Sequence, residues 1–245
     1  MLFYLIIMDL KEKVAYITGG SKGIGLGIAK RLLAGGMKVA ISGRNAVALE
    51  DALTILKGGN SVIAIVSDVT NLESEQKAVE TIMVKWKRVD VVIANAGIGR
   101  FSPIDTMLPE HWHQMINTNL TGVFNTLKAS VEALKASKGY YMTVASLAGI
   151  NFFPQGAGYN ATKFGVVGFT QAAMLDLRKY DIKVTTIMPG SVATHFNGNE
   201  PSLKDAWKIQ PEDIGKLVVD LLTMHPRTLP SKVEVRPSRP DLKSS

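Results

Sequence analysis

Short apolar runs and helical stretches alternate along almost the whole chain, and this alternation restricts the fold more than any other feature. The apolar runs cover residues 14–18, 39–42, 62–66, 91–94, 141–145, 184–188 and 233–235. The stretches with helical spacing between them cover 24–33, 46–56, 73–87, 110–138, 159 onward and 211–224. Regular strand–helix alternation predicts an α/β fold: a doubly wound parallel sheet of about seven strands with helices on both faces.

Length and composition predict a single domain. The chain has 245 residues, of which 46% are hydrophobic and 20% charged, enough for one large core. We predict an apolar arm over 1–9, the domain over 10–237 and a tail over 238–245. The apolar stretch 1–8 is too short to span a membrane, which needs about 20 residues. With no cysteine, disulfides and thiolate chemistry are excluded, and an intracellular, cytoplasmic setting is predicted.

The net charge of +7 is concentrated at the start of the chain. Residues 1–45 hold seven Lys or Arg side chains and two acidic ones. Nucleic acid is one partner that suits a basic protein. Because the cations are sparse and no aromatic residues are interleaved with them, we favour a phosphate on a small ligand. Neither a nucleic-acid nor a membrane partner is predicted.

A glycine-rich turn joins the first apolar run to the first helical stretch. It reads Thr18-Gly19-Gly20-Ser21-Lys22-Gly23-Ile24-Gly25. Glycines here let the backbone turn sharply and approach a pyrophosphate at the positively polarised start of a helix. The spacing differs from the better-known Gly-x-Gly-x-x-Gly, but its place between the first strand and helix predicts a dinucleotide site.

The end of the second apolar run indicates which dinucleotide binds. NAD-binding sheets place an acid there, which accepts hydrogen bonds from the ribose 2′-hydroxyl. This chain has Gly43 followed by Arg44, with no carboxylate. A guanidinium matches the geometry of a phosphate, and Lys22 adds a second positive charge. We favour a 2′-phosphate, and hence NADP(H), over the alternative that Arg44 is only a solvated residue at a helix start.

Ser146, Tyr159 and Lys163 form the candidate catalytic group. Tyr159 and Lys163 are four residues apart on a predicted helix and share one face, and Ser146 follows the fifth apolar run. A free phenol has a pKa of about 10, and a neighbouring ammonium lowers it towards neutrality. The serine can hydrogen-bond a carbonyl oxygen as it becomes negative. The three residues suit acid–base catalysis on a carbonyl, although the pattern is specific only together with a cofactor site.

Taken together, six segments in this order closely resemble the short-chain dehydrogenase/reductase family. They are 18–25, Asp68-Val69, Asn95-Ala96-Gly97, Asn119-Leu120-Thr121-Gly122, Ser146 with Tyr159 and Lys163, and Pro189-Gly190-Ser191-Val192-Ala193-Thr194. The resemblance covers residues 10–237. It implies a Rossmann-like fold and a homodimer or homotetramer assembled through the long helix and the Tyr159 helix.

The resemblance also implies roles for individual residues. Tyr159 would be the general acid/base, and Lys163 would bind the nicotinamide ribose and lower the phenol pKa. Ser146 would position and polarise the carbonyl, and Asn119 would hold a water that links Lys163 to solvent. The cofactor-binding residues would be Gly19, Ser21, Lys22, Gly23, Ile24, Gly25, Arg44, Asp68, Val69, Asn95, Ala96, Gly97, Tyr159, Lys163, Pro189, Gly190, Val192 and Thr194.

The chain departs from the family pattern in two places. Ala94 stands where the family often has Asn, which leaves the backbone role intact. The sequence of the final segment, 231–237, differs from that of many 3-oxoacyl-carrier-protein reductases and is more similar to that of NADP-dependent 3-hydroxy-acid dehydrogenases. This second departure, together with a short segment over 195–209 where the family has a substrate lid, leaves the substrate open. The leading prediction is an NADP(H)-dependent ketone reductase that needs no metal, and the alternative is a reductase of 3-oxoacyl thioesters. A catalytically idle NADP-binding regulator is less favoured, because all four catalytic residues are present. A nucleic-acid binder comes last.

Overall fold

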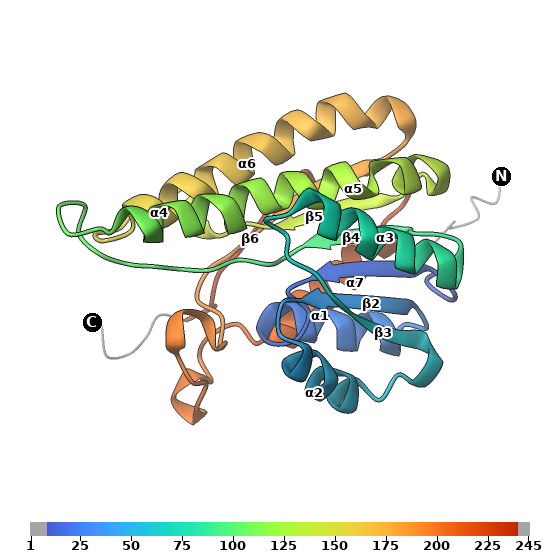
Figure 1. Cartoon of the computed structure of the whole chain (residues 1–245), viewed down its shortest axis with the longest axis horizontal. Helices are drawn as coiled ribbons and strands as arrows, with labels where there is room; N and C mark the ends of the chain where they lie inside the picture. The colour runs from blue at the N-terminus through green and yellow to red at the C-terminus, as the bar shows by residue number, and fades with distance from the viewer. Residues whose placement is uncertain (1–8, 240–245) are drawn as a thin grey trace.

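The computed structural model describes residues 9–239, and the arm predicted at the N-terminus lies almost wholly outside this range. Seven parallel strands form one sheet in the order β3-β2-β1-β4-β5-β6-β7 (Figure 1). The strands are β1 Val14–Thr18, β2 Lys38–Gly43, β3 Val62–Val66, β4 Val91–Ala94, β5 Tyr140–Val144, β6 Lys183–Pro189 and β7 Lys232–Val235. The predicted α/β fold class is confirmed, with strand ends within a residue of those predicted.

Helices cover both faces of the sheet (Figure 1). They are α1 Gly23–Ala34, α2 Ala46–Leu56, α3 Leu72–Trp86, α4 Pro109–Met115, α5 Gly122–Ser137, α6 Ala157–Leu177 and α7 Pro211–Thr223. One core packs α1, α2 and α7 against the sheet, and a second core packs α3, α5 and α6 against the other face. All five residues of β1 are buried because both of its faces are covered.

The long helical stretch predicted over 110–138 is confirmed, but it is not one regular α-helix. A π-helical segment, Ile116–Thr121, separates α4 from α5. Apolar spacing does not reveal such a widened turn, because the apolar stripe continues through it. Widened turns of this kind occur frequently at functional sites, and this one contains Asn119.

The topology fixes the place of a ligand cleft. The chain order reverses between β1 and β4, which are neighbours in the sheet but far apart in sequence. Ligands of open α/β sheets bind beyond the carboxyl ends of the strands at such a switch point. The segment between β6 and α7, drawn in orange in Figure 1, projects from the same edge and contains two short 3₁₀ turns, Phe196–Gly198 and Leu203–Asp205.

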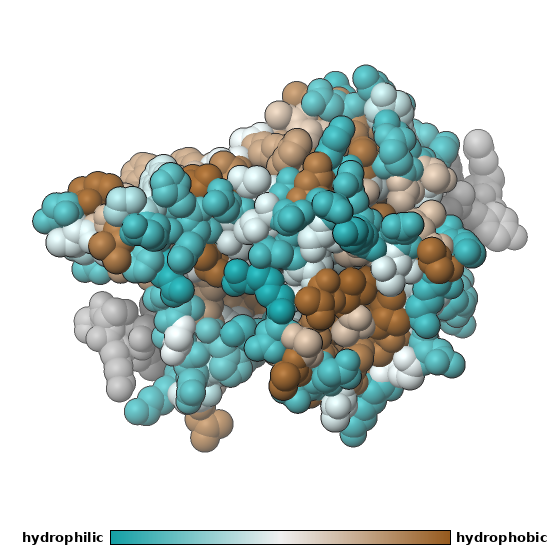
Figure 2. Space-filling view, in the orientation of Figure 1, coloured by the Kyte–Doolittle hydropathy of each residue, from teal (hydrophilic) through white to brown (hydrophobic). Residues whose placement is uncertain are grey.

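The surface has an apolar patch at the β3 edge of the sheet. Figure 2 shows hydrophobic side chains gathered over β3 and α2, where Val47, Ile55 and Val66 are exposed. None of these three lines the ligand cleft. In the described range, no helix combines the length and the hydropathy that crossing a membrane requires.

Candidate active site

The glycine turn after β1 is shaped by its lack of side chains. Gly19 and Gly23 have φ angles of +64° and +55°, which L-residues with side chains rarely adopt. A Cβ on Gly19 would lie 2.9 Å from Ala96 Cα, and a Cβ on Gly25 would lie 2.5 Å from the oxygen of Gly19. The turn is therefore packed as tightly as glycine allows.

The start of α1 fits an anionic ligand. Lys22 occupies the N-cap position without making a side-chain cap, and the first turn of the helix carries no acidic residue. The backbone N–H groups there are left for a ligand, and the helix dipole favours a negative charge. Gly19, Ser21, Lys22, Gly23 and Ile24 all line a cleft of about 1360 Å³. A pyrophosphate fits this cradle.

Thr18 and Asn95 hold the glycine turn in place. The Asn95 side-chain amide donates to the carbonyl oxygens of Thr18 (2.9 Å) and Gly19 (3.0 Å). The Thr18 hydroxyl accepts from the backbone N–H groups of Asn95 and Ala96, both at 3.1 Å. The amide nitrogen of Asn95 therefore supports the turn. Sequence reasoning missed this role of Thr18, since a threonine at a strand end carries no signal of its own.

The far end of the cleft is positively charged. Arg44, at the end of β2, is exposed and lines the cleft together with Lys22 and Gly43. The neighbouring Asn45 caps α2 by accepting from Ala48 N at 3.0 Å. In the described range, Asp68 is the one acidic residue that lines the cleft. The end of β2 thus presents a cation where NAD-binding sheets present a carboxylate.

Asp68 and Val69 form the wall beside the end of β3. Asp68 Oδ1 accepts from the backbone N–H and the hydroxyl of Thr70, both at 2.9 Å. Asn125 Nδ2 donates to the carbonyl oxygen of Val69 at 2.8 Å, which ties this wall to α5. Asp68 and Val69 both line the cleft, and their contact with a cofactor stays a prediction.

A buried carboxylate that sequence reasoning missed supports this wall from behind. Glu75 is fully buried and accepts hydrogen bonds from the hydroxyls of Tyr16 (2.9 Å), Ser67 (2.7 Å) and Thr126 (2.9 Å). These donors come from β1, the turn after β3 and α5. Burial, with the nearby Glu75 carboxylate, raises the pKa of Tyr16 well above its usual value. Glu75 therefore ties three elements together beneath the cleft.

Asn119 lies in the π-helical segment and clamps the chain after β4. Its side chain accepts from Ile98 N at 2.8 Å and donates to Ile98 O at 2.9 Å and to Thr162 Oγ1 at 3.1 Å. These contacts join the β4 loop to α6. The side-chain amide is engaged by protein groups, so a water held by Asn119 would use its backbone. The water-holding role stays a prediction.

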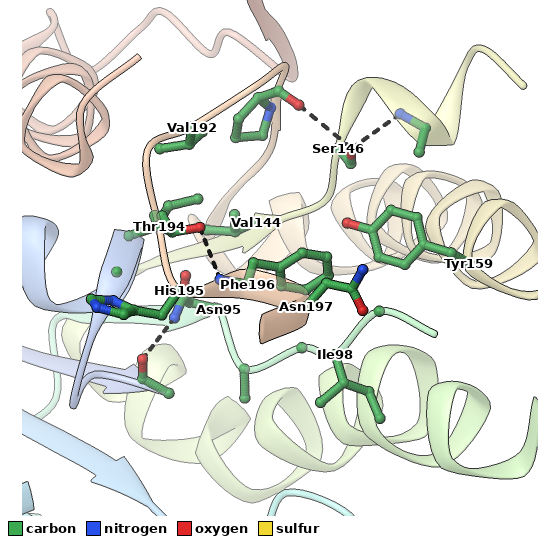
Figure 3. Close-up of a pocket in the computed structure, with 18 of the residues that line it drawn as sticks. Asn95, Ile98, Val144, Ser146, Tyr159, Val192, Thr194, His195, Phe196 and Asn197 are labelled. Atoms are coloured by element: carbon green, nitrogen blue, oxygen red, sulfur yellow. Dashed lines mark hydrogen bonds between the residues drawn. The ribbon is translucent and has the colours of Figure 1, made fainter. Parts of the chain in front are cut away.

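Ser146, Tyr159 and Lys163 meet at the carboxyl end of β5. The Ser146 hydroxyl accepts from Ala148 N at 3.1 Å and donates to Pro189 O at 3.5 Å, as Figure 3 shows. In the same view the phenol oxygen of Tyr159 and the Ser146 side chain face one space. Lys163 Nζ donates to Val144 O at 3.0 Å. All three line the cleft with the glycine turn, so the structure brings the predicted catalytic residues together.

Burial determines the ionisation of this group. It raises the pKa of Tyr159 to about 12, while the Ser146 hydroxyl acts in the opposite direction. Burial also lowers the pKa of Lys163 to about 8. Desolvation of the phenolate is the larger of the two causes of the Tyr159 shift, and a lowering of the phenol pKa by Lys163 stays a prediction. At neutral pH, Tyr159 keeps its proton.

The loop after β6 completes the cleft. Pro189, Gly190, Val192 and Thr194 line it, and Val192 is bridged to Ile209. Thr194 lies against the glycine turn, since a Cβ on Gly23 would be 3.3 Å from Thr194 Cγ2. The loop after β6 therefore lies beside the turn that is predicted to hold the pyrophosphate.

Three phenylalanines beside Tyr159 were not predicted. They are Phe101, Phe153 and Phe196, whose rings pack with each other or with the Tyr159 ring. They come from three loops far apart in sequence, so no local pattern marks them. In the described residues, no group of three or more His, Asp or Glu side chains is placed to hold a metal ion. Metal independence stays a prediction.

Comparison with known proteins identifies the family. The short chain dehydrogenase family model matches residues 13–204. A 3-oxoacyl-[acyl-carrier-protein] reductase of Synechocystis sp. is 35% identical over 223 residues, 87% of this chain and 90% of the relative. The chain therefore belongs to the short-chain dehydrogenase/reductase family, which confirms the resemblance. It is an oxidoreductase.

Solved structures agree in fold and bind nicotinamide nucleotides of both kinds. An alcohol dehydrogenase from the archaeon Thermococcus sibiricus, complexed with 5-hydroxy-NADP, has a TM-score of 0.88 and 31% identity, covering 94% of this chain and 99% of that one. A 3-ketoacyl-(acyl-carrier-protein) reductase from Brucella melitensis, complexed with NADH, has a TM-score of 0.85 and 27% identity over the same shares. The choice between the two nucleotides therefore depends on this chain's own residues.

Proposed function

We propose that this protein is an NADP(H)-dependent reductase that interconverts a ketone and a secondary alcohol. One observation carries the proposal: Ser146, Tyr159 and Lys163 line the same cleft as the uncapped start of α1. An acid–base group and an anion cradle in one cleft suit hydride transfer between a dinucleotide and a carbonyl.

Arg44 and Lys22 support the choice of NADP(H). Both line the cleft at the end of β2, where the ribose of the adenosine half would lie. A guanidinium can bind a 2′-phosphate with two parallel hydrogen bonds. Asp68 would contact the adenine, and Val192 and Thr194 the carboxamide. Asn95, Ala96 and Gly97 would line the adenosine and ribose side.

Tyr159 is the proton donor of the proposed reaction. When bound, the reduced nicotinamide supplies the hydride that adds to the carbonyl carbon. Tyr159 Oη gives its proton to the carbonyl oxygen, so the phenol O–H bond breaks as the alcohol O–H bond forms. A pKa of about 12 keeps this proton in place at neutral pH, and solvent returns it after each turnover.

Ser146 and Lys163 assist this proton transfer. The Ser146 hydroxyl faces the same space as the phenol oxygen and can donate to the carbonyl oxygen as negative charge develops. The Lys163 ammonium, mostly charged below its pKa of about 8, stabilises the tyrosinate left behind. Asn119 holds the neighbouring backbone of Ile98, which keeps the wall of the site in place.

Reduction of 3-oxoacyl thioesters is a second candidate, favoured by the 35% identity to a 3-oxoacyl-[acyl-carrier-protein] reductase. For either substrate we propose a cytoplasmic homodimer or homotetramer. Exposed apolar side chains on α6, among them Phe164 and Leu175, support assembly through the predicted pair of helices.

The proposed function is tested by following the absorbance of NADPH with a panel of ketones, 3-oxo acids and 3-oxoacyl thioesters. Consumption of NADPH with at least one carbonyl, and formation of the matching alcohol, is the expected result. If tight NADPH binding is measured by fluorescence but no carbonyl is reduced, the protein is a cofactor-binding regulator.

A further inference from the structure

Two of the protein's eight phenylalanines, Phe101 and Phe196, pack directly against the ring of Tyr159, and a third, Phe153, packs against Phe101. The centre of the Phe101 ring lies 5.4 Å from the centre of the Tyr159 ring, with an angle of 84° between the ring planes. The centre of the Phe196 ring lies 5.6 Å from that of Tyr159. Phe153 packs edge-on against Phe101 at 5.6 Å. These residues come from the loop after β4, the loop before α6 and the segment after β6. The tyrosine therefore contacts aromatic rings from two separate loops, and a ring from a third loop extends this cluster.

Glycines at two positions make room for these rings. A Cβ on Gly99 would lie 2.6 Å from Phe196 Cε1, and a Cβ on Gly156 would lie 2.6 Å from Phe153 Cε2. The backbone is thus shaped to hold Phe196 and Phe153 close to it. The positions of these two rings therefore depend on glycine at 99 and 156, because any larger residue there would displace them.

The aromatic cluster keeps an open face towards the cleft. Phe101 and Phe153 remain 37% and 41% exposed, although a purely structural cluster of aromatic rings is normally buried. Phe101, Phe153 and Phe196 all line the cleft. In Figure 3 the Phe196 ring lies beside the hydroxyl end of Tyr159. A carbonyl presented to Tyr159 would therefore have its substituent against apolar ring surfaces.

The cationic side chains that line the cleft lie outside this aromatic cluster. Lys22 and Arg44 serve the opposite end of the cleft, and Arg236 is paired with Glu234 at 3.0 Å. Arg100, next to Phe101, is an exposed cation that lines the cleft. Because Arg100 is next to Phe101 in the chain, its replacement tests whether a charged substrate binds at the aromatic cluster. Lys208, which also lines the cleft, is paired with Asp205 at 2.6 Å.

We propose that Phe101, Phe153 and Phe196 form the substrate-binding wall and select uncharged ketones with a flat, ring-sized apolar substituent. The inference rests on the proposed function, since it names the substrate class of the same site. Stacked and edge-on contacts with such a ring would cover the exposed ring faces. A small 3-oxo acid would leave them exposed and bring its carboxylate against apolar rings, which is costly without a paired cation.

The experiment compares kcat/KM for acetophenone, butanone, 3-oxobutanoate and a 3-oxobutanoyl thioester at saturating NADPH. We expect the wild-type protein to prefer acetophenone over butanone by about tenfold or more, as differences of this size in apolar pockets allow. Phe196→Ala should lower that ratio about tenfold, and Phe196→Leu should lower it less. Arg100→Ala should leave it unchanged.

The matched control is Phe124→Ala. Phe124 is a half-exposed phenylalanine packed edge-on against Phe169 at 6.3 Å and lies outside the cleft lining. Its loss should leave the substrate ratio as it is. Preference for 3-oxobutanoate that Arg100→Ala abolishes, or preference for the thioester, overturns the inference and leaves the proposed function intact. If no carbonyl consumes NADPH, the proposed function fails and the inference with it.

Discussion

The ammonium of Lys163 lies 5.6 Å from the centre of the Tyr159 ring, yet burial determines the pKa of both groups. Lys163 donates its hydrogen bond to the Val144 carbonyl. The lysine therefore carries a buried charge without a carboxylate partner, an arrangement that costs stability. Such a cost persists at catalytic sites because function requires the charge.

Lys163→Met should increase the free energy of unfolding at pH 7. Folding lowers the pKa of Lys163 from 10.5 to about 8, so below pH 8 the folded protein binds this proton less favourably than the unfolded chain. Each pKa unit corresponds to about 1.4 kcal/mol. Allowing for the lost hydrogen bond, we expect a gain on the order of 2 kcal/mol in urea unfolding.

The pH dependence provides the control for this prediction. Between pH 8 and 10 the folded state binds fewer protons at this site than the unfolded state, so wild-type stability should rise with pH there. Lys163→Met should show a smaller rise. A less stable variant with an unchanged pH profile would show that the ammonium is not a source of strain.

Arg44→Ala should weaken NADPH binding about tenfold or more while leaving NADH binding nearly unchanged. The reason is the loss of a charge-assisted hydrogen bond, which contributes about 1.5–3 kcal/mol. Both dissociation constants can be measured by fluorescence titration. Equal losses for the two nucleotides would exclude Arg44 as the phosphate-binding residue.

Gly43→Asp is the reciprocal test of cofactor choice. A Cβ at Gly43 would meet its nearest atoms, on Leu49 and Ser21, only at 3.8 Å, so a side chain fits. The new carboxylate would repel a 2′-phosphate and accept from a ribose hydroxyl. NADPH affinity should fall and the NADH preference should rise, measured as the ratio of the two dissociation constants. An unaltered ratio would place the ribose elsewhere.

Glu75→Ala should destabilise the fold without changing the chemistry. Three buried hydroxyls, on Tyr16, Ser67 and Thr126, would each lose one hydrogen bond and keep a second partner. Because each lost hydrogen bond costs about 0.5–1.5 kcal/mol, and more when the acceptor is charged, we expect a loss on the order of 3 kcal/mol in urea unfolding, with kcat retained in the folded fraction. Glu132→Ala, which removes an exposed pair with Lys135, serves as control and should cost less than about 1 kcal/mol.

Several features of this protein are readable from its sequence for physical reasons. Strands such as β1 are covered on both faces, so they appear in the sequence as unbroken apolar runs. The helices that cover them show apolar residues at helical spacing instead. The glycine turn is recognisable because only glycine tolerates its φ angles and close contacts. The grouping of Ser146 with Tyr159 follows because both lie at the carboxyl end of β5.

Other features depend on the folded chain and could not be read locally. The π-helical turn at Asn119 keeps the apolar stripe of an ordinary helix. Phe101, Phe153 and Phe196 meet only because three loops converge. The sign of the Tyr159 pKa shift depends on burial, whereas the sequence shows only that Lys163 is near. Residues 1–8 lie outside the described range, so the prediction made for them stays a prediction.

Chelation provides a test of metal independence. Four histidines and no cysteine give few metal ligands, and catalysis is assigned to Tyr159 without a metal ion. Prolonged dialysis against EDTA should leave the NADPH-dependent rate unchanged. A rate that falls and is restored only by Zn²⁺ or Mg²⁺ would mean that the site contains a metal ion.

The most direct test of the central claim is the single-turnover rate of Tyr159→Phe with NADPH and the best ketone of the panel. The variant keeps the ring and its contacts with Phe101 and Phe196, so fold and NADPH affinity should be retained. Loss of the donated proton should reduce the rate about 10²–10⁴-fold. A near-normal rate with normal NADPH binding would contradict the assignment of Tyr159 as the catalytic acid.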